Sequence, residues 1–174
     1  MRWGCPLLLI LWSGSAFALG PGEASLSGGV GPAVSLGERT QAGVQVGARL
    51  VRGISDAWAG RLGVQSAWYP SAGAAPAPSL HVTTQAIGVT WALDALNFVP
   101  FADIGLLAAD VRGGGANASW HLGAELGGGF DYLVSRHLVT SLVAHVDYLP
   151  LHLTGGHRDR PLQATLALLV GRAF

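Results

Sequence analysis

The segment 41–50, with the sequence QAGVQVGARL, decides the fold because its residues alternate strictly in character. The even positions are all apolar: Ala42, Val44, Val46, Ala48 and Leu50. The odd positions carry glycine, glutamine or arginine. Successive side chains of a β-strand point to opposite faces, so this segment predicts a strand with one apolar face and one small, polar face.

The same alternation recurs along the chain. The predicted strands are 26–36, 41–50, 58–68, 80–93, 98–110, 120–133, 138–149 and 162–174. The pattern is least regular in two of them, where Leu106-Leu107 and Val143 interrupt it. About eight strands of about 10–14 residues can each cross a bilayer when tilted by roughly 45°. The pattern predicts an all-β protein, a closed antiparallel up-and-down transmembrane β-barrel.

The connections between these strands also alternate. Short connections (52–56, 94–97, 134–137) follow every second strand, and longer ones (71–79, 111–119, 150–161) follow the others, except for a tight first connection at 37–39. Short turns on the inner side and longer loops outside are typical of outer-membrane barrels.

Composition supports a membrane environment. Of 174 residues, 50% are hydrophobic and only 11% are charged, against roughly 25% charged in average proteins. Such a chain is too apolar to be disordered and too poor in charge for an ordinary soluble surface. The net charge of +0 gives no sign of nucleic-acid binding.

Residues 1–18 have the features of a secretory signal peptide. Arg2 precedes an apolar run at 6–12, and Ala16-Phe17-Ala18 fits the A-x-A cleavage rule. The apolar run is too short for a membrane-spanning helix. We expect cleavage after Ala18, leaving the barrel at 19–174. The only cysteine, Cys5, lies in this leader, so the mature chain has no disulfide.

Aromatic residues indicate which face of the strands points outward. On the apolar faces they gather near the two ends of the strands, as expected for rings at the two membrane interfaces. The predicted girdle residues are Trp58, Trp68, Trp91, Trp120, Tyr132 and Tyr148. The apolar faces are therefore expected to contact lipid.

The end of the chain carries a family resemblance. Residues 166–174 alternate and close on Phe174, and the stretch GGGFDYLVSR at 127–136 surrounds an inner turn. These features resemble the eight-stranded outer-membrane proteins of Gram-negative bacteria, which include OmpA, OmpX, OmpW and the opacity proteins. Arg172 departs from that pattern, at a cost of about 0–1 kcal/mol near the interface.

The resemblance implies location and partners. It implies a monomer in the outer membrane, in contact with phospholipid and lipopolysaccharide. It also implies that the barrel-assembly machinery recognises the last strand through Phe174.

Much of the chain's scarce charge falls on the inward face. This set comprises Arg49, Arg61, Asp103, Glu125, His145 and Asp147. Counted from the inner turns, the first three lie low and Glu125 and His145 near mid-height. An eight-stranded barrel is just filled by side chains, so opposite charges should pair there and plug the lumen.

No catalytic, metal or cofactor site is expected. No serine is placed as a nucleophile beside His145 and Asp147, and His145-x-Asp147 stands where the lipid A deacylases that share this scaffold would need His-x-Ser. His152 and His157 share one loop without clear ligand spacing. The glycines at 113–115 lack the strand-to-helix context of a phosphate loop.

The leading interpretation is a non-enzymatic outer-membrane barrel with a structural, surface-interaction or minor permeability role. The alternatives are a lipid A-modifying enzyme on the same scaffold, a small channel for hydrophobic solutes, and a soluble lipocalin-type barrel.

Overall fold

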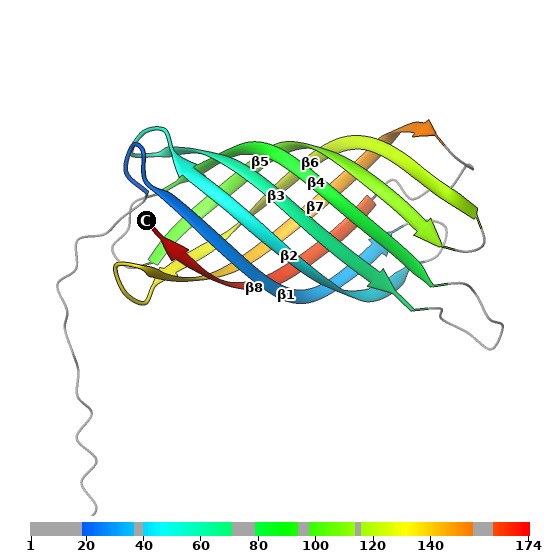
Figure 1. Ribbon diagram of the computed structural model, residues 1–174, viewed down its shortest axis with the longest axis horizontal. Coiled ribbons are helices and arrows are strands. Elements are labelled where there is room, and N and C mark those ends of the chain that lie inside the picture. Colours follow the sequence, from blue (N-terminus) through cyan, green and yellow to red (C-terminus); the bar gives the residue numbers. More distant parts are fainter. Residues whose placement is uncertain (1–18, 37–39, 71–78, 94–97, 114–115, 155–161) are drawn as a thin grey trace, which may run out of the picture.

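The chain folds into a single closed barrel of eight antiparallel strands (Figure 1). The computed structural model describes residues 19–36, 40–70, 79–93, 98–113, 116–154 and 162–174. The strands are β1 Ala24–Leu36, β2 Gln41–Gly53, β3 Trp58–Tyr69, β4 Leu80–Ala92, β5 Phe98–Gly113, β6 Ala116–Leu133, β7 Leu138–Thr154 and β8 Leu162–Ala173. No helix in this part of the chain is long and apolar enough to cross a membrane. The predicted fold class is confirmed.

Each strand pairs with its neighbour in sequence, and the first and last strands close the barrel. β1 pairs with β8 from Ser25 opposite Ala173 to Leu36 opposite Leu162. Closure leaves no unpaired strand edge. The predicted faces are also confirmed: in β2, Val44 points outward and is 58% exposed, whereas Gln45 points inward and is 3% exposed.

The two ends of the barrel differ. At one end, which we call the turn end, tight turns follow β2 and β6. Ile54 N donates to the Trp58 carbonyl at 2.8 Å, and Val134 N donates to the Leu138 carbonyl at 2.9 Å. Residue Phe174 also lies at this end (Figure 1), where its carbonyl accepts a hydrogen bond from Ala24 N at 2.9 Å. The opposite end is called the loop end.

The prediction of long loops at 111–119 and 150–161 was wrong in part. β5 continues to Gly113, β6 begins at Ala116 and β7 continues to Thr154. The glycine and proline residues suggested loops, but the strands continue through them with shifts in the register of strand pairing. The β6–β7 register shifts between Leu122 and Ala124, close to Pro150, which has no N–H to donate. The leader 1–18 and the connections at 37–39, 71–78 and 94–97 lie outside the described residues.

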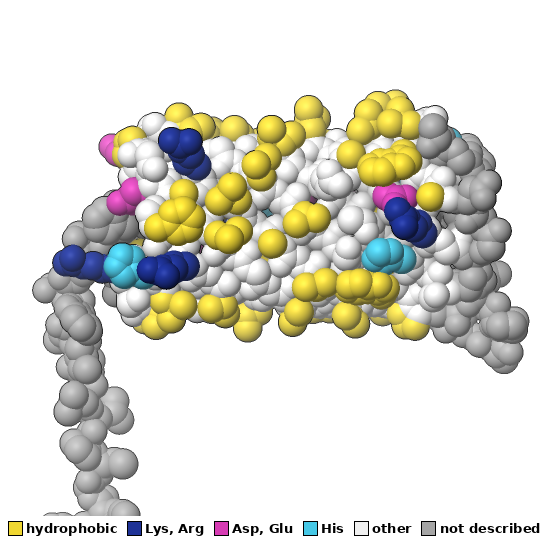
Figure 2. Space-filling model, viewed as in Figure 1, with side chains coloured by type: hydrophobic (Ala, Val, Ile, Leu, Met, Phe, Trp, Pro, Cys, Tyr) yellow, Lys and Arg dark blue, Asp and Glu magenta, His cyan; other side chains and the backbone are white. Residues whose placement is uncertain are grey.

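The outer surface between the two ends is apolar. Figure 2 shows hydrophobic side chains along the whole length of the barrel, with charged groups near the two ends. Large exposed side chains in this belt include Val30, Leu62, Ile87, Ile104, Leu106 and Leu126. An apolar belt open to water would be very unfavourable. A soluble lipocalin-type barrel would place charge outside and apolar side chains inside, the reverse of this distribution.

Candidate functional site in the barrel lumen

The six inward residues predicted from sequence all lie inside the barrel. Arg49, Arg61, Asp103, Glu125 and Asp147 are buried, and the His145 side chain is only 12% exposed. Five of them form one connected group, which we call the ion cluster: Arg49, Arg61, Asp103, Glu125 and His145.

Asp103 on β5 is the centre of the ion cluster. It accepts hydrogen bonds from Arg49 Nη2 at 3.0 and 3.2 Å and from Thr90 Oγ1 at 2.5 Å. The Arg49 guanidinium also lies over the Phe101 ring, 4.3 Å from its centroid. A buried carboxylate with several charge-assisted donors is well compensated, and the Phe101 ring adds a cation–π contact to the arginine.

Arg61 on β3 joins the two acidic residues of the cluster. Its Nη2 donates to Glu125 Oε1, and its Nε lies 3.7 Å from Asp103 Oδ1. Two glycines give the guanidinium its space. A Cβ at Gly105 would lie 3.0 Å from Arg61 Nη2, and one at Gly63 would lie 3.5 Å from Nη1. The small residues on the inward faces therefore leave room for the long side chains of the ion cluster.

His145 on β7 closes the group from the opposite wall. Its Nε2 lies 3.2 Å from Asp103 Oδ2, and its Nδ1 lies 3.8 Å from Glu125 Oε2. The ring occupies the space above its cross-strand neighbour Gly127, where a Cβ would collide with it. Imidazole, carboxylates and guanidinium groups thus connect β2, β3, β5, β6 and β7 across the lumen.

Asp147 is bound differently from the other five. It faces Glu125 in the β6–β7 register and accepts a hydrogen bond from Gln65 Nε2 at 2.9 Å. No salt bridge to an arginine is found for Asp147 among the described residues. The expectation that opposite charges pair therefore holds for the ion cluster, whereas Asp147 has an uncharged amide as its partner.

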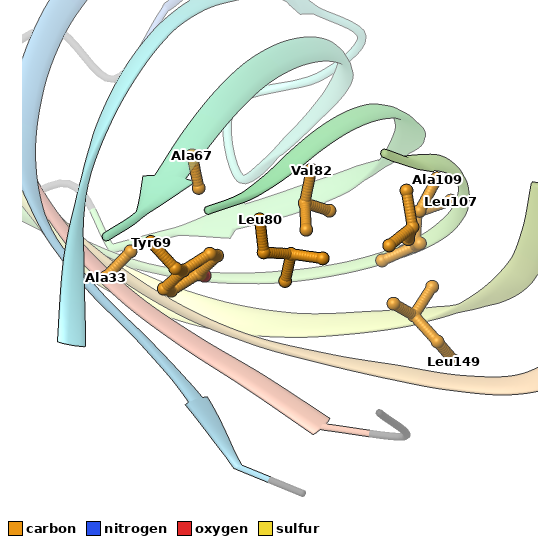
Figure 3. Packing of buried hydrophobic residues seen from close by; sticks show 9 residues of the cluster. Ala33, Ala67, Tyr69, Leu80, Val82, Leu107, Ala109 and Leu149 are labelled. Carbon is orange, nitrogen blue, oxygen red and sulfur yellow. The ribbon is translucent and has the colours of Figure 1, made fainter. Parts of the chain in front are cut away.

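An apolar layer toward the loop end escaped the sequence analysis. Figure 3 shows side chains from β1, β3, β4, β5 and β7 converging inside the barrel. This apolar plug comprises Ala33, Ala67, Tyr69, Leu80, Val82, Leu107, Ala109, Val111 and Leu149. The sequence does contain a signal of this layer, because two successive leucines interrupt the alternation of apolar and polar residues. Leu106 faces outward and Leu107 faces inward. A smaller group of Phe101, Val143 and Leu169 packs separately from the plug.

Two small cavities lie along the lumen among the described residues. A cavity of about 40 Å³ lies beside Arg49, Arg61 and Glu125, and another of about 10 Å³ lies beneath His121 and Leu149. One water molecule needs a cavity of about 10–15 Å³. These cavities can hold a few water molecules but no larger solute.

The predicted girdle residues all lie on the outer surface. Trp58, Trp91 and Tyr132 are exposed toward the turn end, where Trp58 and Trp91 face each other across β3 and β4. Trp68, Trp120 and Tyr148 are exposed toward the loop end. Phe174 is exposed beside the closing strand.

Ser119 Oγ and His121 Nε2 lie within hydrogen-bond distance of each other, at 3.2 Å. Both residues are buried, and the adjoining cavity is the one of about 10 Å³, which is too small for a substrate. His121 also packs against His152, with ring centroids 4.8 Å apart. No group of three or more metal-ligating side chains occurs in the described part of the chain, and His157 lies outside it.

Comparison with known proteins identifies the fold. No family model and no curated protein matches the sequence. Among solved structures, Neisserial surface protein A is 17% identical, with a TM-score of 0.67 over 88% of this chain and 99% of that one. Outer membrane protein OprG from Pseudomonas aeruginosa is 14% identical, with a TM-score of 0.62 over 89% of this chain and 97% of that one. The attachment invasion locus protein Ail of Yersinia pestis is 10% identical, with a TM-score of 0.60 over 88% and 99%. The chain therefore has the fold of the small eight-stranded outer-membrane barrels.

Proposed function

We propose that the chain is an integral outer-membrane barrel with a closed lumen, and that it acts through its outer surface and loops rather than by transport or catalysis. The observation that carries this proposal is the filling of the lumen. The ion cluster extends across the interior and the apolar plug lies toward the loop end; together with the small volumes of the two cavities, about 40 and 10 Å³, they support a lumen closed to hydrated solutes.

The apolar belt and the aromatic side chains at both ends support insertion in a bilayer. Outer-membrane barrels have their short turns on the periplasmic side, so the tight turns support a periplasmic turn end and a loop end that faces the exterior. Phospholipid and lipopolysaccharide would surround the belt. Phe174, exposed on the closing strand, would be the contact for the assembly machinery. The structural neighbours include proteins named for the surface and for attachment, which agrees with a surface role.

A non-enzymatic role is favoured by the position of the Ser119–His121 pair. Both side chains are buried inside the lumen, away from the lipid. A lipid A-modifying enzyme would need a nucleophile and base that reach the ester or sugar of a membrane lipid.

The test is expression of the chain with its leader in a Gram-negative host. We expect it in the outer-membrane fraction, resistant to urea washing, with a gel mobility that changes on boiling. The purified barrel in liposomes should not admit small sugars in a swelling assay. A variant lacking 162–174, which cannot close the barrel, is the control for insertion. Recovery of the full-length protein in the soluble fraction, or swelling of the liposomes, would contradict the proposal.

A further inference from the structure

A pair of histidines lies at the loop end of the barrel, apart from the ion cluster. His121 on β6 and His152 on β7 are opposite each other in the strand pairing. Their ring centroids are 4.8 Å apart, with an angle of 60° between the ring planes. His121 is buried, whereas His152 is exposed near the end of its strand. No metal site is expected here from the sequence alone, because the two histidines are distant along the chain and only strand pairing brings them together.

Shifts in the β6–β7 register place both rings on the same face. Strict alternation from the buried Leu149 would point Leu151 inward and His152 outward. Instead, the register shifts on both sides of His121, and Leu151 is 59% exposed. Irregularities of this kind redirect side chains and are frequent beside functional sites. Here they turn His152 toward His121.

A buried serine holds the ring of His121. Ser119 Oγ lies 3.2 Å from His121 Nε2 and donates to the Val111 carbonyl at 3.5 Å. A hydroxyl has one proton to donate, so this arrangement makes Ser119 Oγ the acceptor of an Nε2–H group on a neutral His121. The electron pair that a metal ion binds is then on Nδ1. Metal-ligating histidines almost always donate their other ring N–H to a partner, which fixes the orientation of the ring.

The spacing of the two rings fits a shared metal ion. With metal–nitrogen bonds of about 2.0–2.1 Å, two imidazoles on one ion have ring centres about 4.5–5.2 Å apart, for angles at the metal of about 90–110°. The 4.8 Å between the rings of His121 and His152 falls within this range. The cavity of about 10 Å³ adjoins His121 and the plug residues Val82 and Leu149 (Figure 3). It has room for one water ligand of the ion.

The donor atoms select the class of ion. Imidazole nitrogen is a ligand for Zn²⁺, Cu²⁺ and Ni²⁺, whereas Mg²⁺ and Ca²⁺ prefer oxygen. Among the described residues, no third histidine, cysteine or carboxylate joins the pair. Water would therefore complete the coordination shell, and the ion would be exchangeable. Because His152 is exposed, the ion can enter from the loop end.

We propose that His121 and His152 form a binding site for a divalent transition-metal ion such as Zn²⁺ or Cu²⁺, with Ser119 positioning the His121 ring. The ion links β6 to β7 where the register shifts disrupt their hydrogen bonds, so it stabilises the loop end of the barrel. This site goes beyond the proposed function, because it requires neither a closed lumen nor a particular orientation in the membrane.

The test uses the purified barrel without a histidine tag, in detergent micelles, with Zn²⁺ and Cu²⁺ as the probes. Calorimetric titration with Zn²⁺ should find a site in the wild type that is weakened more than about tenfold in His121→Gln and in His152→Gln, because each loses one of two ligands. The paramagnetic resonance spectrum of bound Cu²⁺ should show coupling to two imidazole nitrogens in the wild type and to fewer in either variant. The matched control is His81→Gln, which removes the histidine that stacks on Trp68 and should leave the Zn²⁺ affinity unchanged.

Two further measurements test the positioning role and the link between the strands. Ser119→Ala should weaken Zn²⁺ binding about tenfold while the two-nitrogen signal of Cu²⁺ persists, and Ser119→Thr, which keeps the hydroxyl, should restore the affinity. Zn²⁺ should raise the urea midpoint of the wild type but not that of His152→Gln, because a ligand that binds only the folded state stabilises it.

Three results would overturn the assignment. Equal Zn²⁺ affinity in His121→Gln and the wild type would place the ion elsewhere. An equal loss in His81→Gln would mean adventitious binding to surface histidines. Wild-type binding no stronger than that of the double variant of His121 and His152 would make the pair a packing contact. Heat-modifiable mobility is checked first for each protein, so a failure of the barrel itself is recognised separately. Because His152 is exposed, its variant decides the question even where the buried His121→Gln fails to fold.

Discussion

Replacing Arg61 by methionine would leave two buried carboxylates without their shared cation. The Arg61 and Glu125 side chains are 2% and 3% exposed. At the 3.7 Å between Arg61 Nε and Asp103 Oδ1, the Coulomb attraction is about 4–5 kcal/mol at an effective dielectric of roughly 20. The hydrogen bond to Glu125 is lost as well. We expect Arg61→Met to lower the free energy of unfolding by about 3–5 kcal/mol, the usual cost of removing one partner of a buried pair.

The double variant distinguishes a real pair from general damage to the lumen. Arg61→Met with Glu125→Met removes one charge of each sign and fills the space with apolar side chains. Such replacements are often neutral, so we expect the double variant to be more stable than the sum of the single effects by about 2–3 kcal/mol. Urea unfolding in lipid vesicles, followed by tryptophan fluorescence and the gel mobility shift, measures the four free energies.

The matched control pairs Glu125→Met with Arg112→Gln, which lies on the outer surface. These two changes should add within about 0.5 kcal/mol, because the residues share no partner. Additive effects of the Arg61 and Glu125 changes would refute the reasoning, since they would mean that the two charges do not stabilise each other.

Further predictions concern packing and assembly. Gly127→Ala should lower the free energy of unfolding by about 1–3 kcal/mol, because the added Cβ collides with the His145 ring. The control is Gly28→Ala, which should be close to neutral in the same urea titration. Its Cβ would lie 3.6 Å from the Gly47 carbonyl oxygen. Leu80→Ala in the apolar plug should cost about 2–5 kcal/mol, and an unchanged unfolding midpoint would show that the plug is loosely packed. Removal of Phe174 should reduce outer-membrane insertion in cells while changing the urea stability of the folded barrel much less, and equal insertion of both proteins would argue against recognition of this residue.

Alternation within each strand was enough to predict the barrel and its faces. The segment 41–50 became part of β2, with Val44 outside and Gln45 inside, because period two is a local property of the chain. The inward position of the six lumen residues follows from the same rule. The boundaries at the loop end could not be predicted, because pairing and register shifts with β6, rather than local composition, continue β7 past Pro150.

Contacts across the lumen were not predictable in detail. Which side chains meet there depends on how the strands are staggered around the barrel, and no local pattern contains that stagger. Arg49 therefore reaches Thr90, Phe101 and Asp103 on β4 and β5, which nothing in its own segment indicates. The apolar plug was missed for a related reason: Leu107 and Leu149 break the alternation because they fill space inside the barrel.

The most direct test of the closed lumen is the ionic current through the purified wild-type barrel in a planar bilayer. We predict no steady current and no reproducible single-channel openings at neutral pH, because we propose that the ion cluster and the apolar plug close the lumen in series. Insertion is verified in the same preparation by protease resistance and heat-modifiable mobility, so a silent membrane cannot be attributed to absent protein. Reproducible openings of the unmutated barrel, with a conductance that scales with salt concentration, would contradict the account.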